Sequence, residues 1–129
     1  MSGRRLISSG GPWEAVAGYS RAVVVGDSCW VAGTTDAGPD GKSASPGDVA
    51  AQARAIFAII ETALAAAGFT LDEVVRTRMF VIDIGRAAEV TAVHGEIFGR
   101  IRPAATLVAV AALMDASLLI EIEAEAHHG

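Results

Sequence analysis

Apolar and polar residues follow each other along this chain with two different periods, and these periods predict strands and helices in a definite order. Two short β-branched and aromatic runs lie in Arg21–Gly33, separated by Gly26-Asp27, whose backbone tolerates a tight reversal. This segment predicts a β-hairpin. The next stretch, Thr34–Gly47, is rich in Gly, Pro, Ser and Asp, so it predicts a surface loop long enough to rim a site.

A long helix is predicted after this loop. Ser45-Pro46 suits its start, with the serine as cap and the proline in the first turn, and Asp48 suits the positive end of the helix dipole. The polar Gln52 lies off the apolar stripe, and Gly68 ends the helix. The stripe, at spacings of three and four, predicts a helix resting on an apolar surface and comprises Val49, Ala53, Ile56, Ile60, Ala63, Leu64 and Ala67.

One more helix and three strands complete the pattern. The helix covers Arg86–Gly99, and the strands cover Glu73–Asp83, Ala104–Ala112 and Leu118–Ala126. The order β-β-α-β-α-β-β predicts an α+β fold in which both helices cover one face of a mixed sheet. Because apolar residues occur on both faces of the later strands, we expect self-association to bury the second face, most simply around a closed symmetry axis.

Composition and charge narrow the classes of function. The chain has 129 residues, which predicts one domain spanning 1–129, and its mean hydropathy of +0.43 is high for a small monomer. The net charge is −5 and no Lys/Arg cluster tracks a phosphate backbone, so we do not expect nucleic acid to be the primary partner. The single cysteine, Cys29, predicts no internal disulfide. With no apolar run of membrane-spanning length and no signal-like start, a cytoplasmic location is expected.

The C-terminal sequence IRPAATLVAVAALMDASLLIEIEAEA resembles the signature of the Rid (reactive intermediate deaminase) or YjgF family. The likeness continues backwards through VRTRMFVID, DVAAQARAIFAIIETALAAAG and VVVGDSCWVAGTT to Tyr19. This resemblance implies a chorismate-mutase-like α+β fold and a homotrimer with a central barrel. It also implies small-molecule clefts between subunits, and no metal or organic cofactor.

The resemblance also implies a chemistry, from which this sequence departs. In deaminase members an arginine grips the substrate carboxylate, while a glutamate and backbone groups position water at the C=N carbon of a 2-imino acid. Tyr19 and Glu121 match that pattern, but Ala105 stands where the arginine is expected. Ala32 replaces the serine before Gly33, and Thr91 replaces a helical asparagine. A divergent imine or enamine hydrolase is therefore expected, rather than an orthodox 2-imino-acid deaminase.

The candidate catalytic residues each have a structural alternative. Glu121 is the candidate for moving a proton between water and nitrogen, and otherwise an outward-facing strand glutamate. His94 borders the inner stripe of its helix, so it is either a proton shuttle or a hydrogen-bonded residue at the core edge. The candidate substrate-binding positions are Tyr19, Gly33, Thr34, Arg78, Thr91, Ala105 and Thr106, and no metal site is predicted.

Two arginines on one strand face offer a replacement for the missing cation. Arg76 and Arg78 are about 7 Å apart at two-residue spacing. They either bind the ligand, Arg78 being the stronger candidate, or pair with the acidic ladder Glu121, Glu123 and Glu125. Trp13, Trp30 and Cys29 are expected to be packing residues.

Three functions remain open at this point. The first is a Rid-type hydrolase with Glu121 handling the proton in an intersubunit cleft. The second is a non-catalytic trimeric metabolite-binding or regulatory module, for which Ala105 is the main support. The third is an endoribonuclease or translation inhibitor, activities ascribed to some members, against which the acidic balance argues.

Overall fold

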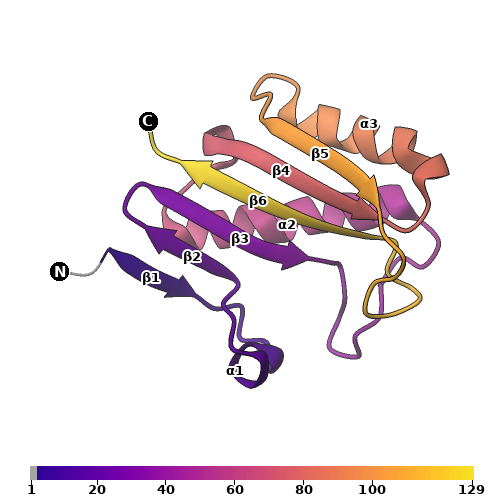
Figure 1. The fold of residues 1–129 in the computed structure, drawn as a ribbon, viewed down its shortest axis with the longest axis horizontal. Coiled ribbons are helices and arrows are strands. Elements are labelled where there is room, and N and C mark those ends of the chain that lie inside the picture. Colours follow the sequence, from indigo (N-terminus) through magenta and orange to yellow (C-terminus); the bar gives the residue numbers. More distant parts are fainter. Residues whose placement is uncertain (1–2) are drawn as a thin grey trace.

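One six-stranded sheet with two long helices along the same face makes up the architecture (Figure 1). The computed structural model describes residues 3–129. Its strands are β1 (Arg4–Ile7), β2 (Ala22–Val25), β3 (Ser28–Thr34), β4 (Val74–Val81), β5 (Ala104–Ala109) and β6 (Ile120–His127). Its α-helices are α1 (Trp13–Ala17), α2 (Val49–Ala67) and α3 (Ala87–Phe98), and 3-10 turns occupy Leu71–Glu73 and Ile84–Arg86.

The strand order is β1-β2-β3-β6-β4-β5, so the last strand in sequence lies inside the sheet between β3 and β4. Every neighbouring pair is antiparallel except β4 and β5, which are parallel and joined through α3. This confirms the predicted α+β fold with a mixed sheet and both long helices on one face. The predicted hairpin is β2 and β3, which turn at Gly26-Asp27.

The N-terminal strand β1 and the short helix α1 were not predicted. Only Leu6 and Ile7 of β1 are apolar, so its sequence carries no clear alternation. Pairing with β2 supplies its backbone partners, and the Arg5 guanidinium donates to the carbonyl of Ala67 at 2.8 Å. Tertiary contacts therefore form this strand, rather than local preference.

The start of α2 corrects the prediction at Ser45-Pro46. The helix begins at Val49, with Asp48 as its cap, because the Asp48 carboxylate accepts a hydrogen bond from the Ala51 amide at 3.0 Å. The end agrees with prediction: Gly68 adopts φ 87°, a left-handed conformation that favours glycine.

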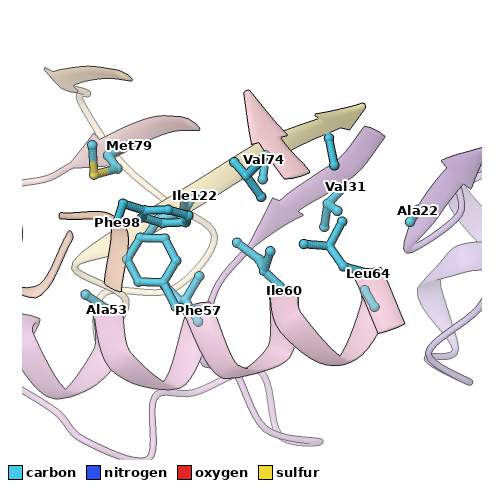
Figure 2. Close-up of a cluster of buried hydrophobic side chains, with 14 of the residues drawn as sticks. Ala22, Val31, Ala53, Phe57, Ile60, Leu64, Val74, Met79, Phe98 and Ile122 are labelled. Carbon is cyan, nitrogen blue, oxygen red and sulfur yellow. The ribbon is translucent and has the colours of Figure 1, made fainter. Parts of the chain in front are cut away.

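The core lies between α2 and the sheet, and Phe98 of α3 packs into it (Figure 2). Phe57 of α2 meets Phe98 of α3 edge to face, with ring centroids 5.4 Å apart. By length and composition alone α2 is apolar enough to cross a membrane, but its stripe is buried against the sheet as in the core helix of a globular domain. Burial of this stripe is the main apolar contribution to stability.

Gln52 corrects the predicted helical pattern, because it is 0% exposed although polar. Its amide nitrogen donates to the carbonyls of Ser45 at 3.1 Å and Ser117 at 2.9 Å, and its oxygen accepts from the Leu119 amide at 2.9 Å. The side chain thus satisfies three backbone groups of two loops, which a buried amide must do to be tolerated.

The sheet face away from the helices agrees in part with expectation. Phe80 of β4 and Val108 of β5 are apolar residues on this open face, and β6 places the predicted ladder of Glu121, Glu123 and Glu125 there, while its own isoleucines and alanines face the core. The register between β4 and β6 shifts after Val74, and Val75 is exposed where continued alternation predicted burial. The open face is therefore polar at its centre, and its exposed apolar side chains lie mostly toward β1, α1 and β3.

Replacing Gln52 by alanine should lower the free energy of unfolding by about 3 kcal/mol, because three buried backbone groups lose their partner. Urea denaturation measures the change. Thr62→Ala, an exposed substitution on the same helix, serves as the control and should change stability by less than about 0.5 kcal/mol. Equal stability of the two variants would contradict the bridging role.

Candidate functional site

Glu121 and Gly33 meet where β6 passes the end of β3. A β-carbon built at position 33 would collide with the Oε2 atom of the Glu121 carboxylate, so any other residue there would displace the end of this side chain. The register between β3 and β6 is irregular between Val31 and Thr34, which brings Gly33 toward the carboxylate. The sequence prediction that these two residues share a site is consistent with this contact.

The surroundings of Glu121 favour its protonated form. Burial raises the pKa of this carboxyl group, the Glu123 charge raises it further, and the positive charge of Arg21 acts in the opposite direction. A carboxyl group with a raised pKa can both take and give a proton closer to neutral pH. Glu121 is therefore an outward-facing strand glutamate whose surroundings suit proton transfer, and its catalytic role stays a prediction.

An open groove of about 590 Å³ lies on the same face of the sheet. Tyr19 and Arg78, two of the predicted binding residues, line this groove, whereas Glu121 is not among its lining residues. Trp30 also lines the groove and is 43% exposed, and Trp13 is 66% exposed, so neither is the packing residue that we predicted. The aromatic side chains thus face solvent in the single chain.

Arg78 forms ion pairs across the sheet. Its Nη1 atom is 3.3 Å from Oε1 of Glu123 and 2.9 Å from Oε1 of Glu125. Of the two predicted interpretations, pairing with the acidic ladder therefore applies to Arg78, the residue that we had favoured for the ligand. Within residues 3–129, Arg76 forms no ion pair.

His94 lies on the helix-covered side of the sheet. Its Nε2 atom is 2.9 Å from Oγ1 of Thr77, and its ring contacts Phe57 and Phe98. Burial lowers the pKa of this imidazole, which favours its neutral form. Since Glu121 points to the open face, His94 is a residue of the core edge and does not reach Glu121 of the same chain.

The other predicted binding positions divide between two regions. Ala105 is exposed on the edge strand β5 in register with Thr77, and Thr91 is exposed on α3, so both belong to the side of His94. Thr106 is exposed beside Arg78 on the open face. Thr34 is buried and donates its hydroxyl proton to the Ala32 carbonyl at 2.8 Å, which leaves the prediction that the Gly33-Thr34 backbone contacts a ligand as a prediction. One chain does not unite these groups in one cleft.

Arg21 is the residue near Glu121 that the sequence analysis missed. Its Nη2 atom donates to the carbonyls of Ala32 and Gly33, both at 2.8 Å. The hairpin register places Arg21 opposite Ala32, and this pairing was the available signal. Without the position of Glu121, however, an arginine at a strand start has no evident role.

The part of the chain that the structure describes contains no cluster of metal-ligating side chains. No group of three His, Cys, Asp or Glu side chains among residues 3–129 could hold an ion. Cys29 is buried, and burial raises the pKa of its thiol, so it is a core residue as predicted.

Comparison with known proteins identifies the family to which this chain belongs. The family model described as Endoribonuclease L-PSP matches residues 11–128, and the chain belongs to this family, also known as the Rid or YjgF family. A crystal structure of Rv2704 from Mycobacterium tuberculosis, of the YjgF/YER057c/UK114 family, is 48% identical with a TM-score of 0.87, covering 97% of this chain and 99% of that one.

Two curated relatives extend the comparison. An uncharacterised protein of Streptomyces coelicolor, SCO2049, is 35% identical over 97% of this chain and 92% of its own length. The 2-iminobutanoate/2-iminopropanoate deaminase of Rattus norvegicus is 33% identical over 98% of this chain and 91% of its own length. The resemblance seen in the sequence is therefore confirmed at the level of family and fold.

Glu121→Gln should stabilise the protein at pH 7. The raised pKa of Glu121 means that ionisation costs more in the folded than in the unfolded chain, so wild-type stability falls as pH rises from the ordinary glutamate range through the folded-state pKa. The neutral amide avoids this cost. Thermal unfolding should give a higher Tm for the variant at pH 7, and the difference should disappear near pH 4.

Glu61→Gln is the matched control, because Glu61 is exposed on α2 and has no ion pair within residues 3–129. Its Tm should follow wild type at both pH values. A Glu121→Gln variant that is no more stable than wild type at pH 7 would contradict the unfavourable environment of the carboxylate.

Proposed function

We propose that this protein is a Rid-type hydrolase of an imine or enamine that lacks the usual carboxylate. Its site would form in a cleft between subunits of a homotrimer, with Glu121 moving the proton. The observation that carries the proposal is the partly buried Glu121 carboxylate, in contact with Gly33 and with a raised pKa. Family membership, and a relative named as a 2-iminobutanoate/2-iminopropanoate deaminase, support the reaction class.

The reaction adds water to a C=N bond. The water oxygen bonds to carbon, protons pass to nitrogen, and the C–N bond then breaks to give a carbonyl compound and ammonia. Glu121 would accept the proton of the attacking water as a carboxylate and return it to the departing nitrogen as an acid, while main-chain groups near Gly33 orient the substrate. An enamine enters the same sequence after protonation at carbon.

Division of the candidate residues between two regions supports an intersubunit site. Glu121 and Gly33 meet on the open face of the sheet, where Tyr19 lines the groove, whereas Ala105, Thr91 and His94 belong to the helix-covered side, at the β5 edge and α3. A second copy bringing its β5 edge to the first region would unite the two. Exposed Leu6, Trp13, Val16, Tyr19 and Trp30 provide apolar surface suited to such an assembly.

Charge at the site supports a ligand without a carboxylate. Position 105 is alanine, and the Arg78 guanidinium is already paired with Glu123 and Glu125. An anionic ligand near Glu121 would meet the like charge of Glu123, whereas a neutral imine would not. Losing one desolvated charge pair to a substrate costs several kcal/mol, and each 1.4 kcal/mol is about a tenfold change in rate.

Ammonia release from freshly generated enamines tests the proposal. The protein should accelerate hydrolysis of a neutral enamine, and it should accelerate hydrolysis of 2-aminoacrylate by a smaller factor. Glu121→Gln should lower the rate of hydrolysis of the neutral enamine at least about 100-fold. Glu61→Gln, on the exposed side of α2, is the control and should retain the wild-type rate. If neither substrate is accelerated and Glu121→Gln changes nothing, the protein is not this hydrolase.

Ala105→Arg should transfer the preference to 2-imino acids. Because Ala105 is exposed at the β5 edge, the longer side chain has room, and its planar guanidinium can pair with a carboxylate. Deamination of 2-iminopropanoate should rise at least about tenfold, since the added pair contributes more than 1.4 kcal/mol. Ala104→Arg, on the opposite face of the same strand, should give no gain. Equal rates for the two variants would reject position 105 as the clamp.

A second candidate, a non-catalytic metabolite-binding module, is favoured by the alanine at position 105 itself. A ligand at 100 times its Kd would stabilise the fold by about 2.7 kcal/mol without turnover, in wild type and Glu121→Gln alike. The family model's description also names an endoribonuclease. With a net charge of −5 and no basic stripe in the sequence, this activity is less well supported, and titration with single-stranded RNA at physiological salt tests it.

A further inference from the structure

We propose that Arg21 is a positioning residue for Glu121: it holds the end of β3 against the carboxylate and supplies the positive charge that acts on it. The inference deepens the proposed function and rests on it for its catalytic meaning. Its physical content concerns the contacts of one guanidinium, and these can be tested without turnover.

The hydrogen bonds of Arg21 converge on the peptide groups that carry Gly33. The Ala32 amide donates to the main-chain oxygen of Arg21 at 3.0 Å, and the Arg21 Nη2 atom donates back to the carbonyls of Ala32 and Gly33. These residues lie where the β3–β6 register is interrupted, so the regular strand ladder does not hold them. The Arg21 guanidinium therefore orients Ala32 and Gly33, the segment that the Glu121 carboxylate contacts.

The hydrogen bonds of Arg21 do not by themselves explain why it lies here. Its Nε atom is buried and has no acceptor among residues 3–129, and only Nη2 is engaged. Burial lowers the pKa of this guanidinium, against the effect of the nearby Tyr19, Glu14 and Glu121. A partly buried guanidinium whose Nε has no acceptor among residues 3–129 is costly, which points to a role for the charge itself.

Among the groups that act on the Glu121 carboxylate, Arg21 supplies the positive charge. Glu123 on the same strand adds negative charge, Phe80 is the β4 residue in register, and β3 contributes Gly33. Arg78 is bound to Glu123 and Glu125 further along the sheet. Arg21 is thus the cation that counteracts burial at the carboxylate, keeping it able to ionise as well as to bind a proton.

A carboxyl-carbon NMR titration of Glu121, assigned with Glu121→Gln, tests the inference directly. Arg21→Gln removes the charge but keeps an amide that can donate to a carbonyl, and it should move the Glu121 midpoint to higher pH. Arg21→Lys keeps the charge and should move the midpoint less. The acidic limb of the hydrolysis pH profile, where activity is present, should move in the same direction as the titration.

Arg76→Gln is the matched control, because it removes an arginine of β4 that does not act on Glu121, and it should leave the midpoint unchanged. Should Arg21→Gln fail to fold by circular dichroism, Arg21→Met is the second neutral variant, with the same upward shift expected. A folded neutral variant with the wild-type midpoint, or an equal shift in Arg76→Gln, overturns the inference. A shift in a protein without hydrolase activity supports the inference and rejects only the proposed function.

Discussion

Strand β6 alternates strictly between buried apolar side chains and glutamates on the open face, and this alternation fixes its register with β3 and β4. This strand lies inside the sheet, with Ile120 and Ile122 fully buried beneath α2 and the three glutamates on the other face. A slip of one residue would turn all three carboxylates into the core, where each would lose its water without gaining a partner. The register is therefore strongly specified, and with it the place where Glu121 meets Gly33.

The same periodicity explains what could be predicted from the sequence. Alternation in β6, the helical stripe of α2 and the Gly26-Asp27 turn are local patterns, and the elements they predict are present. Strand β1 was missed because its four residues acquire strand structure from β2. Gln52 was misplaced because hydropathy assigns an amide to the surface, whereas its partners Ser117 and Leu119 are more than sixty residues away in the chain.

The candidate site shows a similar division between local and distant information. Tyr19, Gly33 and Glu121 were identified because they match positions of a family pattern, which needs no knowledge of their contacts. The roles of Arg21 and Arg78 follow instead from which strands become neighbours and where the β3–β6 register is interrupted. Sequence reasoning named the correct pairing for Arg78 as an alternative but could not choose it, because both interpretations place arginine and glutamate on adjacent strands.

The ion pairs of Arg78 also bear on the kind of ligand that the site can accept. Exposed pairs of this type contribute little to stability, so their main consequence is to relieve repulsion between Glu123 and Glu125. If Arg78 bound the carboxylate of a ligand, it would no longer neutralise Glu123 and Glu125, and these two carboxylates would again repel each other. Position 105 is alanine, Arg21 is bound to main-chain carbonyls at the end of β3, and Arg78 is bound to Glu123 and Glu125, so none of these three positions offers a free cation to a ligand. This distribution of charge is the basis of our proposal that the substrate is an uncharged imine or enamine.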